Sequence, residues 1–449
     1  MFGLFKAKPP ISAWEKAWTE YRLCELAEQF GMKPLLETPT LVPSFEGIPS
    51  VANLADAEQL LEFLQTWLKL DSGKIRLQLF TDVVAPESIS SFDDNEHVIQ
   101  VTDEELLDRD ELVAKFANSL IRQAFIRNGL APATTSDDEW IIDLLPTFLG
   151  LGIFIANRSD RPSQNAVGSI AWWSPRQRAT LPARMTGYAL ALRSVVRNEL
   201  EVPWTQSLRH DAQIAFADGM NFLQKSGDTI FARELLTQPR RQFSEDTLVD
   251  ELNSGSPSAK ITAMWGLSER VDRRSPEPNG RIGDLIRDAI RHKQPEVRAV
   301  AAETLPLFDR SIDAAQDLCD ALSDSSEEVR IASAGALAAY PGVDDESLVF
   351  DLTRALKDDD RLVVFNAARS LTAYGKAAES AVKTLLQRLR RAAVECREQE
   401  ALTIVWALNA IADDALTVIR DFFSDGDEEF EEYALQLLEQ VTSEATQTT

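Results

Sequence analysis

The sequence predicts a mainly α-helical protein, in which an α+β N-terminal domain precedes a C-terminal α-solenoid of short repeats. In the first half, apolar residues recur at helical spacing, and two short stretches alternate polar and apolar residues as strands do. The most apolar run of the chain, WIIDLLPTFLGLGIFIAN at Trp140–Asn157, is typical of a central buried element. Past residue 240 the sequence repeats itself, which indicates stacked helix pairs.

The composition limits the compartment and the class of partner. A chain of 449 residues is long enough for two or more domains, and 46 basic residues against 72 acidic ones give it a net charge of -26. This charge disfavours nucleic acid or an anionic membrane as the main partner, because both need a cationic surface. The three separate cysteines form no disulfide framework, and the start MFGLFKAKPP does not read as a signal peptide. We therefore expect a cytoplasmic protein.

The first elements of the N-terminal domain follow from local patterns. Ser12–Phe30 is amphipathic and predicts a helix, and Ala55–Leu70 predicts a second one. Lys74–Phe80 and His97–Val101 alternate polar and apolar residues, which predicts two half-buried strands.

Two capping boxes in succession predict where the next helix begins. Thr102 pairs with Glu105, and Asp108 pairs with Glu111, each three residues later. We therefore expect a helix to begin near Arg109.

The run Trp140–Asn157 reaches the lower limit of a membrane span in length. Asp143 and Pro146 in its first half, with Gly150 and Gly152 in its second, argue against spanning, because these groups would need partners inside the lipid. We expect instead a central buried helix that is broken near Pro146.

This region resembles a known family. The strand, the helix DELVAKFANSLIRQ, an acidic loop and the segment DLLPTFLGLGIFIAN are similar to the zincin-type metallopeptidase-like domains of bacterial proteins. The likeness continues at Arg184–Leu192 and Trp204–Leu223. In such domains the helix carries HExxH, whose two histidines bind zinc while the glutamate activates a water molecule.

The corresponding positions in this chain do not carry that chemistry. Asn118 and Arg122 stand where the histidines would be, and Ser119 stands at the glutamate. A guanidinium repels a metal ion and serine cannot act as the base, so the resemblance implies a domain without metal, cofactor or peptidase activity. The alternative is an unrelated α/β domain in which Asn118 and Arg122 lie on a solvated helix face.

Three segments of the C-terminal half align with one another, and degenerate copies flank them to give about six repeats. The segments are LIRDAIRHKQPEVRAVAAETL from Leu285, LCDALSDSSEEVRIASAGAL from Leu318 and LTRALKDDDRLVVFNAARSL from Leu352. They resemble HEAT repeats, especially the short bacterial type also seen in phycobilisome-lyase-like proteins. In that family no repeat buries its apolar face alone.

Four charged residues recur at fixed places in these repeats. Asp324 and Asp358 fall in the turns, and Arg298 and Arg330 fall at the start of the second helices. The resemblance implies that such residues link the turns of adjacent repeats, so we assign them a structural role.

A basic group stands out against the acidic background at Arg388, Arg390 and Arg391. It could dock an acidic segment of a partner protein, or it could be an ordinary helix surface paired with nearby carboxylates.

These observations indicate a non-enzymatic scaffold or adaptor of two domains, 1–240 and 241–449, that binds partner proteins through its HEAT array. The alternative is a hydrolase-like enzyme with an unrecognised site in the N-terminal domain. A nucleic-acid-associated HEAT protein is disfavoured by the charge.

The degenerate motif generates a first prediction, that the purified protein carries no stoichiometric zinc. Metal analysis after mild purification measures this directly. Near-equimolar zinc that disappears when His97 or His210 is replaced would overturn the assignment of a metal-free domain.

Overall fold

The computed structural model describes residues 8–80, 97–127, 138–158, 180–199, 201–231, 244–271, 280–423 and 428–447. Contacts within the chain divide it into two compact units, Met1–Phe243 and Ser244–Thr449. Among the helices of these described ranges, none has both the length and the apolar content that crossing a bilayer requires.

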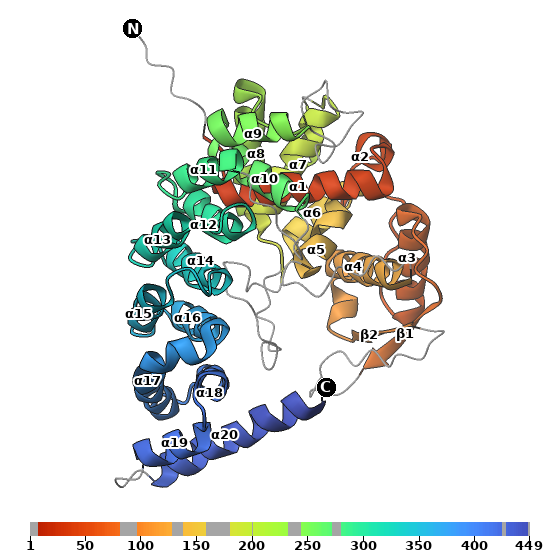
Figure 1. Ribbon diagram of the computed structural model, residues 1–449. Helices are drawn as coiled ribbons and strands as arrows, with labels where there is room; N and C mark the ends of the chain where they lie inside the picture. Colours follow the sequence, from red (N-terminus) through yellow and green to blue (C-terminus); the bar gives the residue numbers. More distant parts are fainter. Residues whose placement is uncertain are drawn as a thin grey trace. The chain divides into compact units, whose positions relative to one another are not determined.

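The N-terminal unit combines eight α-helices with one small sheet in its described part (Figure 1). Its elements are α1 Ala13–Phe30, α2 Lys33–Glu37, α3 Leu54–Leu68, β1 Ile75–Phe80, β2 His97–Thr102, the 3₁₀ turn η1 Glu105–Leu107, α4 Arg109–Arg127, α5 Asp138–Phe148, α6 Gly152–Asn157, α7 Ala183–Val196, the 3₁₀ turn η3 Pro203–Ser207 and α8 His210–Ser226.

The two expected strands are confirmed, and they pair in parallel, from Ile75 opposite His97 to Phe80 opposite Thr102. The capping box at Thr102 is also present, because the backbone N–H groups of Thr102 and Glu105 each donate to the other residue's side chain. This box begins η1, and α4 follows at Arg109 as predicted.

The prediction that the apolar run forms the centre of this unit is confirmed. Every residue from Ile142 to Ala156 is buried. Trp140, at the start of the run, packs edge-on against Trp18 of α1 with 5.4 Å between ring centroids. The segment therefore packs against α1 through α5 and against α7 through both α5 and α6.

The expected break near Pro146 is confirmed, because α5 ends at Phe148, two residues after this proline, and α6 begins at Gly152. Pro146 lies in the last turn of the helix, and the chain turns at Gly150, whose φ is +91°. The N–H of Leu151 donates to the carbonyl of Pro146 at 2.7 Å, and that of Gly150 donates to Thr147. This is the Schellman pattern, which needs a left-handed residue at the glycine.

Gly150 is also held by a close neighbour. A Cβ placed on it would come within 2.3 Å of the carbonyl oxygen of Pro39, and the N–H of Leu41 donates to the Gly150 carbonyl at 2.8 Å. The segment after α2 therefore lies directly against the turn between α5 and α6, and this approach excludes any side chain.

In its described ranges, the C-terminal unit is a stack of six helix pairs. The pairs are α9 Glu245–Ser254 with α10 Pro257–Ser268, α11 Gly280–Ala289 with α12 Pro295–Thr304, α13 Ile312–Ala321 with α14 Glu327–Ala336, α15 Asp345–Ala355 with α16 Arg361–Tyr374, α17 Val382–Val394 with α18 Glu398–Ile411, and α19 Ala415–Phe423 with α20 Glu428–Gln447. The first helices α11, α13, α15 and α17 form one row, and the second helices α12, α14, α16 and α18 form the other (Figure 1).

The second helices of neighbouring repeats pack more closely than the first helices do. Small residues such as Ala301, Ala334 and Ala367 allow this approach, and all three are fully buried. Leu305 and Leu337, at the ends of their second helices, are also fully buried. Because one row is closer packed than the other, the first helices form the outer row of a curved stack.

The geometry at Gly150 predicts that Gly150→Ala destabilises the N-terminal unit by about 2–4 kcal/mol, from a left-handed φ and overpacking together. Gly227→Ala, after α8, is the matched control, because this residue is also left-handed, with φ +62°, but a Cβ there meets nothing within 4 Å. The control should cost only about 1–2 kcal/mol. Thermal and urea unfolding measure both, and equal losses would contradict the role of the Pro39 contact.

Candidate functional site

The three positions of the degenerate motif lie on α4 in different surroundings. Asn118 and Ser119 are half-buried, and Arg122 is exposed. The side-chain amide of Asn118 donates to the carboxylate of Asp143 on α5, with Nδ2 and Oδ1 2.5 Å apart. The interpretation of Asn118 as part of a solvated face is therefore wrong, because its side chain joins two helices of the core.

Asp143 is the centre of this cluster. It is 2% exposed, and it accepts hydrogen bonds from three separate parts of the unit. Besides Asn118, these are the guanidinium of Arg158 after α6, at 3.0 Å, and the backbone N–H of Leu181 before α7, at 2.8 Å. A buried carboxylate must be surrounded in this way to offset the loss of water. Asp143 thus connects four consecutive helices, α4 to α7.

The residues present do not fit a zinc ion. The amide of Asn118 presents its N–H to Asp143, Arg122 is a permanent cation, and the negative charge of Asp143 is already paired with Arg158. Across the described ranges of the chain, no three histidine, cysteine, aspartate or glutamate side chains are grouped so that they could bind a metal.

His97, the histidine at the start of β2, lies beside the same helix. Its Nδ1 is 2.9 Å from the amide nitrogen of Gln123, the residue after Arg122. Burial lowers the pKa of His97, and the positive charge of Arg122 lowers it further. The imidazole is therefore neutral at neutral pH and accepts a hydrogen bond from Gln123, so it acts as a link between the sheet and α4.

In the C-terminal unit, the four recurrent charged residues form two bidentate pairs between adjacent repeats. Arg298 donates to both carboxylate oxygens of Asp324, at 2.7 and 2.8 Å. Arg330 donates to both oxygens of Asp358, at 2.8 and 3.1 Å. Burial alone would raise the pKa of Asp324, but hydrogen bonds from Arg298 and the N–H of Ser326 outweigh it and lower that pKa.

Each of these arginines also donates back to its own turn. Arg298 reaches the carbonyls of His292 and Lys293, and Arg330 reaches the carbonyl of Asp324. The turns of three consecutive repeats are thus joined in an arginine ladder, which we define as Arg298, Asp324, Arg330 and Asp358 with these carbonyls.

The basic group on α17 divides into two kinds of residue. Arg388 is 5% exposed, donates to Glu400 of α18 at 2.5 Å, and reaches the carbonyl of Asp358 at 3.4 Å. Its proposed role in partner docking is therefore corrected, because its guanidinium is inside the array and extends the arginine ladder. Arg390 and Arg391 are exposed.

A second set of links was missed by the sequence reasoning. The hydroxyl of Tyr340 donates to the carbonyl of Asp309, and that of Tyr374 donates to the carbonyl of Leu337, each at 2.7 Å and each in the preceding repeat. Burial raises the pKa of both phenols. The available signal was the recurrence of tyrosine after a Leu-x-Ala sequence at both places.

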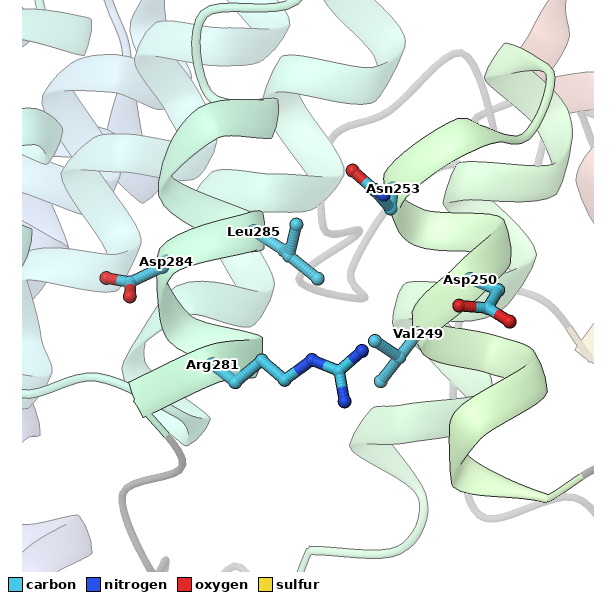
Figure 2. Close-up of a pocket in the computed structure, with 6 residues that line it drawn as sticks. All are labelled: Val249, Asp250, Asn253, Arg281, Asp284 and Leu285. Carbon is cyan, nitrogen blue, oxygen red and sulfur yellow. The ribbon is translucent and has the colours of Figure 1, made fainter.

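The first two repeats also form a pocket of about 440 Å³ between α9 and α11, which is open to solvent. Figure 2 shows Arg281 of α11 reaching toward Val249 of α9, while Asp250 and Asn253 come from the α9 side. Its six lining residues include no histidine, serine or cysteine, so the pocket offers neither a nucleophile of these types nor an imidazole base.

Residues 245–338 and 315–403 match the family model for HEAT repeats. The C-terminal unit carries HEAT repeats. The match covers the repeats that contain the arginine ladder, and it fits the helical solenoid seen in the structure. HEAT arrays are surfaces for protein–protein contact built by stacking.

The other comparisons add no function. No curated protein matches the chain. Two crystal structures of engineered proteins are similar to it, one at 22% identity over 44% of this chain and 96% of its own, with a TM-score of 0.29. The other is 16% identical over 96% of this chain and 99% of its own, with a TM-score of 0.31. Scores this low say nothing about how this chain is arranged.

The cluster around Asp143 predicts that Asp143→Asn lowers the stability of the N-terminal unit by about 2–4 kcal/mol. The substitution removes the nearer of the two carboxylates that pair with Arg158, since Glu111 is at 3.9 Å. Arg158 and the Leu181 N–H donate to different oxygens of Asp143, and an asparagine has only one oxygen to accept them. Asp110→Asn is the matched control, since this carboxylate of α4 has a side chain 41% exposed. Urea unfolding should show a change within about 0.5 kcal/mol for the control. Equal stability of the two variants would contradict a structural role for Asp143.

Proposed function

We propose that this protein is a non-enzymatic scaffold or adaptor that binds partner proteins along its HEAT array, and that the N-terminal unit is a catalytically inactive zincin-like domain. The observation that carries the proposal is the stack of six helix pairs, of which residues 245–403 match HEAT repeats. The likeness of these repeats to the short bacterial type is part of the proposal.

The contacts of the array support a role in presenting a surface. The arginine ladder on one side and the hydroxyls of Tyr340 and Tyr374 on the other hold adjacent repeats in register. A partner site that spans several repeats is stable only when neighbouring repeats are held in register.

The side chains at the motif positions support an inactive N-terminal domain. Asn118, Ser119 and Arg122 replace the two ligands and the base of HExxH, and Asp143 is occupied by structural hydrogen bonds. These four side chains therefore either stabilise the core or lie at its surface. None of them is a nucleophile that a neighbouring base could activate.

The proposal predicts that Leu337→Asp abolishes partner capture. Leu337 is fully buried, and an unpaired carboxylate there should cost several kcal/mol, so the middle of the array should open. Affinity capture with the tagged full-length chain, followed by mass spectrometry, measures the loss. Hydrogen exchange on the same sample should show that α13 to α16 lose protection while α4 to α7 keep it.

Ala377→Asp is the control, because Ala377 is exposed and the same charge there leaves the core intact. This variant should capture partners as the natural chain does. Undiminished capture by Leu337→Asp, with the array shown to be open, would assign recognition to the N-terminal unit instead.

A further inference from the structure

The outer row of the HEAT array changes its charge along its length. The buried residues Ile282, Ala314, Leu348 and Leu385 occupy equivalent places in α11, α13, α15 and α17. The residue six places after each of them is exposed on the outer side of its helix. In the order α11, α13, α15 and α17, these residues are Asp288, Asp320, Arg354 and Arg391. The same surface position is therefore acidic in the second and third repeats and cationic in the fourth and fifth.

The cationic character of α17 extends over the whole helix. Its sequence VKTLLQRLRRAAV holds four basic residues and no carboxylate. Arg388 is used inside the array, while Lys383, Arg390 and Arg391 are exposed. Arg391 pairs with Glu395 at 3.0 Å, and Arg354 of α15 pairs with Asp351 at 3.1 Å. Even so, in a chain whose net charge is -26, α17 itself is opposite in sign to the molecule that carries it.

Large apolar side chains stand exposed on the same two helices. Phe350 of α15 is 68% exposed, and Val394 at the end of α17 is 63% exposed. Phe350 lies one helical turn before Arg354, so it is on the same side of α15. Exposed cations of α15 and α17 thus share one face of the array with apolar side chains that would gain from burial.

We propose that this face, defined by Phe350, Arg354, Lys383, Arg391 and Val394, docks an acidic segment of a partner protein that carries aliphatic or aromatic side chains among its carboxylates. The inference rests on the proposed scaffold function and names the chemistry of the partner. Carboxylates of the segment complement Lys383 and join Asp351 and Glu395 around the guanidinium groups of Arg354 and Arg391. Its apolar side chains cover Phe350 and Val394.

The chemistry of the face favours a protein segment over nucleic acid. A nucleic-acid backbone supplies phosphates for the cations but little apolar surface for Phe350 and Val394. A long polyanion is also repelled by the rest of a chain with a net charge of -26. A short acidic segment carries fewer charges, so the chain repels it less. Its ion pairs with Arg354 and Arg391 offset that repulsion.

The test uses the full chain and a short fluorescein-labelled peptide in which glutamate and aspartate alternate with leucine and phenylalanine. Fluorescence anisotropy at low salt should show binding that weakens as salt is added. The double variant R354E/R391E should weaken it about tenfold or more, and Phe350→Ser should weaken it at every salt concentration. A peptide with glutamine and asparagine in place of the acids should bind the natural chain weakly.

Arg420→Glu is the matched control, because Arg420 on α19 is a cation with 57% side-chain exposure outside the proposed face. It should leave peptide affinity unchanged, and circular dichroism should show that every variant keeps its helices. Unchanged affinity in R354E/R391E, or no binding by the natural chain at low salt, would overturn the proposal. Binding of an oligo-dT strand or of phosphatidylserine vesicles that is tighter than peptide binding and equally lost in R354E/R391E would also overturn it.

The result of the peptide-binding test can be distinguished from the result of the partner-capture test of the scaffold proposal. If Leu337→Asp abolishes partner capture while R354E/R391E leaves peptide binding intact, the array is the recognition module and this face is not its docking site. If capture survives in the opened array, the scaffold proposal itself fails.

Discussion

The N-terminal unit depends on satisfying carboxylates that are buried in its core. Asp143 lies within a segment in which every residue from Ile142 to Ala156 is buried, and its three donors come from different parts of the unit. Glu20 of α1 is placed in the same way, with the ammonium of Lys16 at 3.1 Å and the hydroxyl of Tyr188 at 2.6 Å. A charge withdrawn from water in this manner fixes the position of every element that donates to it.

The same requirement explains why parts of this unit could be predicted and others could not. The helix from Ala13, the two strands and the start of α4 follow from capping residues and apolar spacing, which are local. The role of Asn118 was not visible, because its partner Asp143 is distant in sequence and nothing in the spacing of α4 indicates a polar contact in the core. The break near Pro146 could be predicted, but the proline is not its only cause. A proline in the last turn removes one hydrogen bond, and the turn at Gly150 is set by its contact with Pro39.

In the repeat array, sequence patterns indicate the helices and turns well, because each repeat restates the same signals. Arg298 and Arg330 lie where the resemblance places linking residues, and their carboxylate partners lie in the next turns. Arg388 shows the limit of such patterns. It belongs to a cationic run of α17, yet its guanidinium is buried against Glu400 while Arg391 of the same run is exposed. Composition alone cannot show which of these two arginines is buried, because their burial depends on which side of α17 faces the adjacent helices.

The two sets of inter-repeat links run in opposite directions along the chain. Arg298 and Arg330 reach forward to the carboxylate of the next turn, and Tyr340 and Tyr374 reach back to a carbonyl of the preceding repeat. If the helix pair α13–α14 and its turn were removed as a unit, Arg298 would meet the position of Asp358, and Tyr374 would meet the region of Asp309. Every donor would again find an acceptor of the kind it has lost. An array linked in this way tolerates duplication or deletion of whole repeats, so its length can change in evolution without redesign of the joints.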